Sequence, residues 1–113
     1  MITKSRKITR ALFPSYQSPK INWMGKVLRV VCYKRLQSIQ SEARFGVVVS
    51  KKQYKTTVER NLFKRRVFHV VSQTENTFDQ SQYEKFVFSP IVKVEHISFS
   101  AIVHDIQELL TIL

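Results

Sequence analysis

RFGVVVSKKQYKTTVERNLFKRRVFHVVS, residues 44–72, changes its hydrophobic pattern once, from a valine-rich run to helical spacing. Residues 44–50 are dense enough in valine to form a strand that is covered on both faces. Thr56 and Glu59 have the spacing of a capping box, so we expect a helix over about 57–72. A strand that leads into a helix is the first half of a β–α–β crossover.

The expected helix has one apolar side and one basic side. At roughly 100° per residue, Phe63, Val67 and Val70 fall together as a stripe for the sheet. The adjoining sector is polar and carries Arg60, Asn61, Lys64 and Arg65, with Arg66 close by. A solvated face is the ordinary interpretation of such a sector, but Glu59 is the only carboxylate between residues 45 and 74, where an exposed helix usually intersperses Glu with Lys. We therefore interpret the basic sector as a surface for an external anion.

Cations also follow the end of the valine-rich strand. Ser50, Lys51, Lys52 and Lys55 lead into the basic helix and predict one continuous positive ridge. A ridge of this kind suits a folded RNA, whose phosphates come from several directions. Leu62 and Phe68 project away from the apolar stripe. We expect Leu62 to pack against another element and leave open whether Phe68 packs or offers an aromatic surface.

The remaining segments predict an α/β two-layer sandwich. In chain order the pattern indicates a short basic helix (3–13) stopped by Pro14, a loop (15–25), a strand (27–34), the strand and helix above, a strand within 85–94 up to at least Ser89, and a final helix (98–113). The order is helix, strand, strand, helix, strand, helix, with room for one more short strand. In the final helix, apolar side chains at 102, 106, 109, 110 and 113 lie along one side.

Composition bounds the class of protein. The chain has 113 residues, enough for one domain over 1–113, and its 43% apolar content supports a real core. A net charge of +11 makes phosphate-rich nucleic acid the expected partner, with an anionic membrane surface as the rival. No apolar run is long enough to span a bilayer, and the N-terminus lacks a secretory apolar core. The single cysteine, Cys32, is expected to be buried, which fits a cytoplasmic protein.

The sequence offers no recognisable catalytic constellation. Its two glycines form no phosphate-binding loop, and its few scattered carboxylates argue against a two-metal nuclease centre. Asp105 and Glu108 are three apart on the last helix, where we expect a solvated face. The three histidines, His69, His96 and His104, show no ligand-like cluster, so we expect no metal bound by the protein and no catalytic residue.

At this point the residues resemble a known family. RFGVVVSKK followed by ERNLFKRRV is similar to the protein component of bacterial ribonuclease P, which carries an R-x-G strand ending in SKK and an R-N-R-x-K-R helix. The matching positions are Arg44, Gly46, Ser50, Lys51, Lys52, Arg60, Asn61, Lys64 and Arg65. The closing segment SFSAIVHDIQELL is similar to the family's last helix. Leu62 stands where the family usually has Arg, which indicates a divergent member.

The resemblance implies a specific function. It implies that the β–α–β crossover is left-handed and that the basic helix docks on the catalytic RNA. It further implies that a cleft between the sheet and the first helix holds the single-stranded 5′ leader of precursor tRNA. Cleavage during tRNA 5′-end maturation would belong to ribonuclease P RNA and its Mg²⁺ ions, with the protein as an accessory subunit of an endoribonuclease.

Leader binding needs aromatic surfaces as well as charge, because unpaired bases present π-faces. Phe13, Tyr16, Trp23 and Tyr33 are the candidates, and Phe13 and Tyr33 are the two that we favour. Core packing is the alternative for each of them.

Two other functions stay open on the sequence. One is a different RNA-binding module, such as a ribosome-associated protein or an RNA chaperone. The other is a DNA-binding regulator that places the helix at 57–71 in a major groove. Strands rather than a preceding helix flank that helix, so we expect no DNA partner.

Overall fold

The sheet of the computed structural model has four strands in the order β1-β2-β4-β3. The structure describes residues 7–8, 19–35, 42–49, 56–92 and 97–113. The elements are β1 (Lys20–Met24), β2 (Leu28–Lys34), β3 (Arg44–Val47), α1 (Thr57–Ser72), α2 (Glu75–Asp79), β4 (Tyr83–Pro90) and α3 (Phe99–Ile112). β1, β2 and β4 are antiparallel neighbours, whereas β3 pairs with β4 in parallel. The predicted mixed α/β class and the β–α–β crossover are confirmed, and the left-handed sense stays a prediction.

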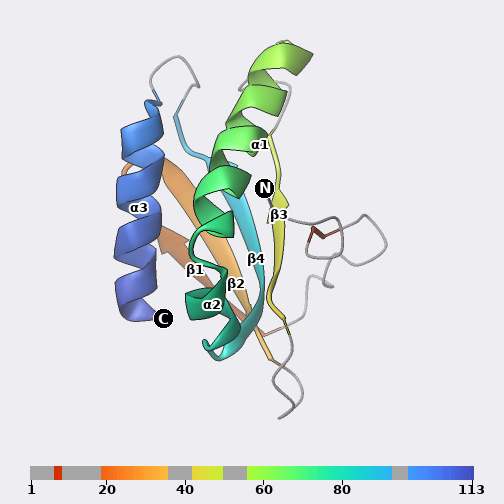
Figure 1. The fold of residues 1–113 in the computed structure, drawn as a ribbon, viewed down its shortest axis with the longest axis vertical. Helices are drawn as coiled ribbons and strands as arrows, with labels where there is room; N and C mark the ends of the chain where they lie inside the picture. The colour runs from red at the N-terminus through yellow and green to blue at the C-terminus, as the bar shows by residue number, and fades with distance from the viewer. Residues whose placement is uncertain (1–6, 9–18, 36–41, 50–55, 93–96) are drawn as a thin grey trace.

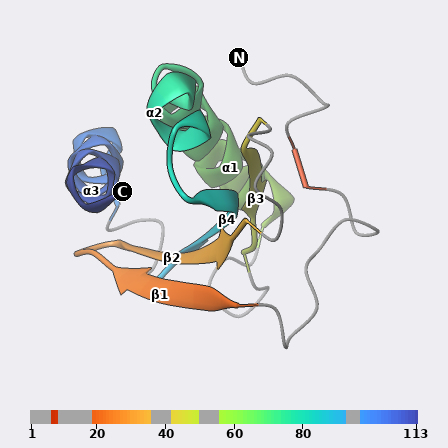
Figure 2. The same cartoon turned by 90° about the horizontal axis from the view of Figure 1, so that it is seen from below.

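All three helices cover the same face of the sheet (Figure 2). Phe45, Phe86 and Phe88 of the strands are fully buried, as are Phe63 of α1 and Phe78 of α2. Phe78 makes edge-on contacts with Phe45 and Phe86, at centroid distances of 5.1 and 4.7 Å. The described helices and strands therefore share one hydrophobic core, to which α3 adds Ile102, Ile106 and Leu109.

α1 begins and ends where the sequence predicts. Thr56 is the N-cap, and its hydroxyl accepts a hydrogen bond from the Glu59 amide at 3.2 Å. The buried side is made of Phe63, Val67, Val70 and Val71. α3 is capped in the same way by Ser98, which accepts from the Ala101 amide at 3.2 Å. α1 and α3 lie side by side in Figure 1, and their N-terminal ends point the same way.

The loop predicted for residues 15–25 is wrong from Lys20 onward, because Lys20–Met24 is an edge strand paired with β2. Ile21 and Trp23 pack against the core while Asn22 and Met24 are exposed, which is the alternation of a half-buried strand. Pro19 and the glycine at 25 delimit this strand and do not mark a loop.

Two further segments differ from the prediction. The turn formers after Ser72 include a five-residue helix, α2, which the burial of Phe78 holds in place. In the helix predicted over 3–13, Lys7 instead makes a parallel bridge with Phe45, and the Ile8 amide donates to the Phe45 carbonyl at 2.8 Å. The other residues of that range lie outside the described part of the chain.

Candidate nucleic-acid interface

The polar residues of α1 divide between two sides of the helix. On the side of β3, the Phe68 ring lies 4.8 Å from the Lys7 ammonium, and Lys64 precedes Phe68 by one turn. On the side of α3, Arg65, Arg66 and His69 line a hollow together with an α3 side chain. Arg60, Lys64 and Arg66 are half-buried, whereas Asn61 and Arg65 are exposed. α1 therefore presents cations in two directions.

The cations of α1 differ in the contacts that their side chains make with other described residues. Arg60 donates to the Thr57 hydroxyl at 3.2 Å and has further interactions. Within the described ranges, Lys64, Arg65 and Arg66 form no ion pair and no hydrogen bond from their side chains. Unpaired guanidinium and ammonium groups of this kind are free to bind phosphates.

Phe68 and Leu62 both project from α1 away from its buried stripe, but they differ in how far they are buried. Phe68 packs partly against the core and is half-buried. Leu62, which we expected to pack, is instead 37% exposed, and Val58 one turn earlier is 77% exposed. The predicted ridge residues Ser50, Lys51, Lys52 and Lys55 lie outside the described residues, as does Phe13, and they stay predictions.

The outer face of the sheet, opposite the helices, carries a second basic surface. Leu28, Val30 and Cys32 point into the core, so Arg29, Val31 and Tyr33 must point outward. The register of the four strands then aligns one outward residue from each strand in a single row: Lys20, Tyr33, Lys85 and Arg44. We call these four residues the outer row.

The outer row combines a tyrosine with three cations. The Lys20 ammonium lies 5.8 Å from the centre of the Tyr33 ring, within range of a cation–π interaction. Tyr33 is half-buried, and so are Lys85 and Arg44. Of the other aromatic candidates, Trp23 packs against the core on the opposite face. The structure thus leaves Tyr33 as the described candidate with an outward aromatic ring.

The prediction that Asp105 lies on a solvated helix face is wrong. Expected on a solvated face, it is fully buried in α3. Its Oδ2 accepts the amides of Val27 at 2.8 Å and Leu28 at 3.0 Å, and its Oδ1 accepts the amide of Lys26 at 3.1 Å. The buried carboxylate is tolerated because these three donors, in the turn after β1 and at the first residue of β2, replace its hydration.

His104, Asp105 and Glu108 can bring one ligand atom each within 4.8 Å of one another. His104 Nε2 lies 3.5 Å from Glu108 Oε1, and both side chains are about half exposed. Since both oxygens of Asp105 already accept amides, the group fits a helix-surface ion pair better than a metal site. Cys32 is no better suited to chemistry, because burial raises the pKa of its thiol to about 12.

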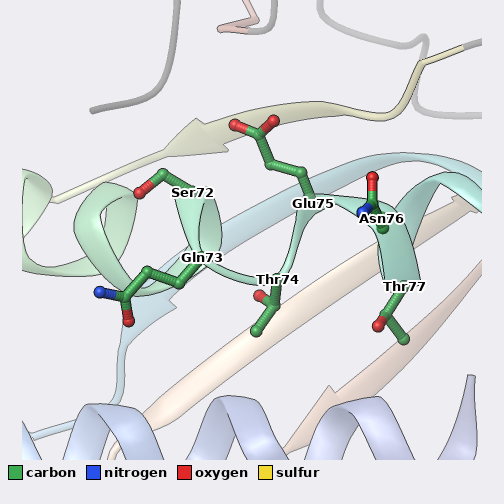
Figure 3. A pocket seen from close by; sticks show the side chains of 6 residues that line it. All are labelled: Ser72, Gln73, Thr74, Glu75, Asn76 and Thr77. Carbon is green, nitrogen blue, oxygen red and sulfur yellow. The ribbon is translucent and has the colours of Figure 1, made fainter.

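A hollow of about 390 Å³ lies at the junction of α1 and α2, lined by residues 72–77. Figure 3 shows that its side chains do not converge: Glu75 and Asn76 point to one side, and Gln73, Thr74 and Thr77 point to the other. Without converging groups the junction has no recognisable site chemistry.

Sequence reasoning missed Lys20, Lys85 and Phe99 as surface candidates. The alternation of apolar and polar residues in β2 and β4 could have placed Tyr33 and Lys85 on the outward faces of their strands. Only the pairing register of β2 with β4 shows that the two residues are neighbours. Phe99 has helical spacing with Ile102 and Ile106, so the pattern predicts a core residue, yet its side chain is 41% exposed.

A sheet with helices on one face and a basic row on the other, next to a basic helix, defines a protein suited to polyanions, with no recognisable catalytic group among its described residues. The family model for ribonuclease P matches residues 3–113. The chain belongs to the ribonuclease P protein family. It is the protein subunit of that ribonucleoprotein, and its role is in tRNA processing.

Solved structures agree with this fold. The ribonuclease P protein from Thermotoga maritima superimposes with a TM-score of 0.66 at 21% identity, covering 83% of this chain and 84% of its own. A Staphylococcus aureus ribonuclease P protein, a mutant described as defective in mRNA degradation activity, gives a TM-score of 0.75 at 18% identity, covering 96% and 88%. No curated protein matches the sequence at a significant level. In the described residues, no helix is both long and apolar enough to cross a membrane.

Proposed function

We propose that this subunit is accessory and non-catalytic, and that it acts in the cytoplasm on precursor tRNA. α1 docks on the ribonuclease P RNA through Arg60, Asn61, Lys64 and Arg65, and the ridge at 50–55 extends this contact. The outer face of the sheet binds the 5′ leader. Cleavage of the leader belongs to the RNA and its Mg²⁺ ions.

The outer row is the observation that carries the leader proposal. Its four residues cross the whole sheet and set one aromatic ring among three cations. Single-stranded nucleic acids are bound by this combination, because the bases stack on the ring while the cations follow the backbone. Since a leader has no fixed sequence, stacking and charge suit it better than base-specific hydrogen bonds.

The accessory role is supported by the burial and hydrogen bonding of two potentially reactive side chains. Cys32 is a neutral, buried thiol, and the Asp105 carboxylate is held by three backbone amides. Neither group can serve as a nucleophile or a general base without breaking the packing that holds it. By contrast, Asn61 and Arg65 of α1 are exposed and can be reached by a large anionic partner.

Reconstitution tests the proposal. The purified protein, the cognate ribonuclease P RNA and a precursor tRNA are assayed singly and together over a Mg²⁺ series. We expect no cleavage by the protein alone and a higher rate with the RNA at low Mg²⁺ when the protein is added. Polylysine at equal positive charge is the control, and it should not reproduce a preference for leader-bearing over mature tRNA. Robust cleavage by the protein without RNA would overturn the proposal.

A further inference from the structure

A hollow of about 230 Å³ lies between α1 and α3, away from the outer row. It is lined by Arg65, Arg66 and His69 of α1 and by Phe99 in the first turn of α3. Arg65, Arg66 and His69 are consecutive or one turn apart on α1, whereas Phe99 lies 30 positions after His69 in the chain. The packing of α3 against α1 therefore builds the hollow.

The hollow has an aromatic wall. Phe99 is 41% exposed, although the core residues that follow it on the same side of α3 are fully buried. The centroid of its ring lies 5.9 Å from that of His69, with the two rings tilted by 46°. The imidazole lies against the side-chain amide of Gln73, with the two nitrogens 3.4 Å apart. These rings offer flat apolar surface of the kind on which a nucleobase stacks.

The hollow also has unpaired positive charge. Neither Arg65 nor Arg66 forms an ion pair or a side-chain hydrogen bond among the residues that the structure describes. Among the described residues that line the hollow there is no carboxylate. Guanidinium groups bind phosphate through paired N–H donors, and a site without acidic groups does not repel it.

We propose that the hollow between α1 and α3 binds one unpaired RNA nucleotide, with its base against Phe99 and His69 and its phosphate on Arg65 and Arg66. The size supports this occupant, since sites for drug-sized ligands have volumes of roughly 300–1,000 Å³ and this hollow is smaller. A single flat base fits such a space, whereas a folded peptide segment does not. The proposal rests on the role of the protein in an RNA complex and adds a contact on the side of α1 that faces α3.

The direct test uses small probes and the full-length protein. AMP and inorganic phosphate are titrated separately, and the NMR signals of the Phe99 and His69 rings are followed. We expect AMP to shift the signals of both rings in a saturable way. Phosphate should bind more weakly and should not depend on the Phe99 ring. Phe99→Leu should lower the AMP affinity by roughly fivefold to a hundredfold and leave phosphate binding unchanged, because it removes only the stacking face. Arg66→Gln should weaken both ligands.

The second test uses ribonuclease P RNA and separates this proposal from the function of the subunit. Phe99→Leu should weaken RNA binding, Phe99→Trp should retain it, and Ile112→Ala, which truncates an exposed apolar residue near the other end of α3, should have no effect. If the wild type binds the RNA but Phe99→Leu binds equally well, or if AMP shifts the two rings no more than phosphate does, the nucleotide site is refuted while the subunit role stands. If the wild type itself fails to bind the RNA, the subunit proposal fails first.

Discussion

The carboxylate of Asp105 accepts the backbone N–H of Val27 at 2.8 Å, and this bond fastens α3 to the turn between β1 and β2. The same carboxylate accepts the amides of Lys26 and Leu28, so one buried side chain satisfies three backbone donors. A buried charge is tolerated here because charge-assisted hydrogen bonds replace its hydration. The contact also fixes where α3 lies, and with it the position of Phe99 beside α1.

Removing this carboxylate should destabilise the protein strongly. Asp105→Ala leaves three amides without an acceptor, and each buried unsatisfied group costs about 1–3 kcal/mol. Because water can reach part of the turn, we expect a loss of about 3–5 kcal/mol in the free energy of unfolding, measured by urea denaturation.

The matched controls are Asp105→Asn and Glu108→Gln. The first keeps one acceptor oxygen and should fall between the wild type and Asp105→Ala. The second changes an exposed carboxylate three residues away and should alter the free energy of unfolding by no more than about 0.5 kcal/mol. Equal, small effects of all three substitutions would show that the buried carboxylate does not anchor α3.

Gly25 is the residue that lets Asp105 approach the turn. A Cβ built at Gly25 would lie 2.5 Å from Asp105 Cγ and 2.7 Å from Trp23 Cη2, both closer than contact distance. Gly25→Ala should therefore cost roughly 1–3 kcal/mol in the free energy of unfolding, a typical penalty for overpacking. In an Asp105→Ala background the main clash is absent, so the added cost should shrink and the two changes should be non-additive. If the two costs add in this double-mutant cycle, the destabilisation by Gly25→Ala does not come from a clash with Asp105.

Much of the fold could be predicted because local signals and tertiary packing agree. The cap at Thr56 and the stripe from Phe63 to Val71 place α1 without any long-range information. β1 was missed because it has only five residues and is bounded by Pro19 and Gly25, two residues that favour a loop, although its residues alternate as in a half-buried strand. Its pairing with β2 and the packing of Trp23 decide its structure, and both are tertiary effects.

The positions of the candidate residues were predictable where they lie on one helix and unpredictable where they come from several elements. The unpaired cations of α1 follow from spacing and from the lack of nearby acidic residues. The alignment of Lys20, Tyr33, Lys85 and Arg44 depends on the strand order, which periodicity does not contain. Asp105 was misassigned because its polar side chain favours a solvated position unless donors from a distant turn reach it.

The basic side of α1 that faces β3 can be tested by salt dependence. Arg60→Ala and Lys64→Ala should weaken binding to ribonuclease P RNA with little loss of stability, since both side chains lie off the buried stripe. Each lost phosphate contact should flatten the slope of log K against log salt by roughly 0.7–0.9. Lys34→Ala, which removes an exposed cation at the end of β2, is the control and should leave the slope unchanged. An unaltered slope in the folded double variant would show that this side of α1 is a solvated surface that does not contact RNA phosphates.

Tyr33 provides the test of leader binding on the outer face. Tyr33→Leu keeps most of the apolar burial but removes the aromatic ring that lies beside Lys20. Base stacking contributes ~1–3 kcal/mol by alanine substitution, so affinity for leader-bearing tRNA should fall by up to about a hundredfold. Affinity for the catalytic RNA and for mature tRNA should barely change, because neither presents a 5′ leader. Fluorescence titration with the three RNAs measures each affinity.

The control for Tyr33 must share its face without its ring. Met24→Leu meets this condition, since Met24 is 64% exposed and Asn22 and Met24 alternate with the core-facing residues of β1. It should leave leader preference intact. If Tyr33 serves only to pack the sheet, Tyr33→Leu should lower the midpoint of thermal denaturation and weaken all three RNAs alike. The Tyr33→Leu protein could instead be stable and prefer leader-bearing tRNA as strongly as the wild type does. That result would show that the Tyr33 ring does not contribute to leader recognition, which would then depend on the three cations of the outer row.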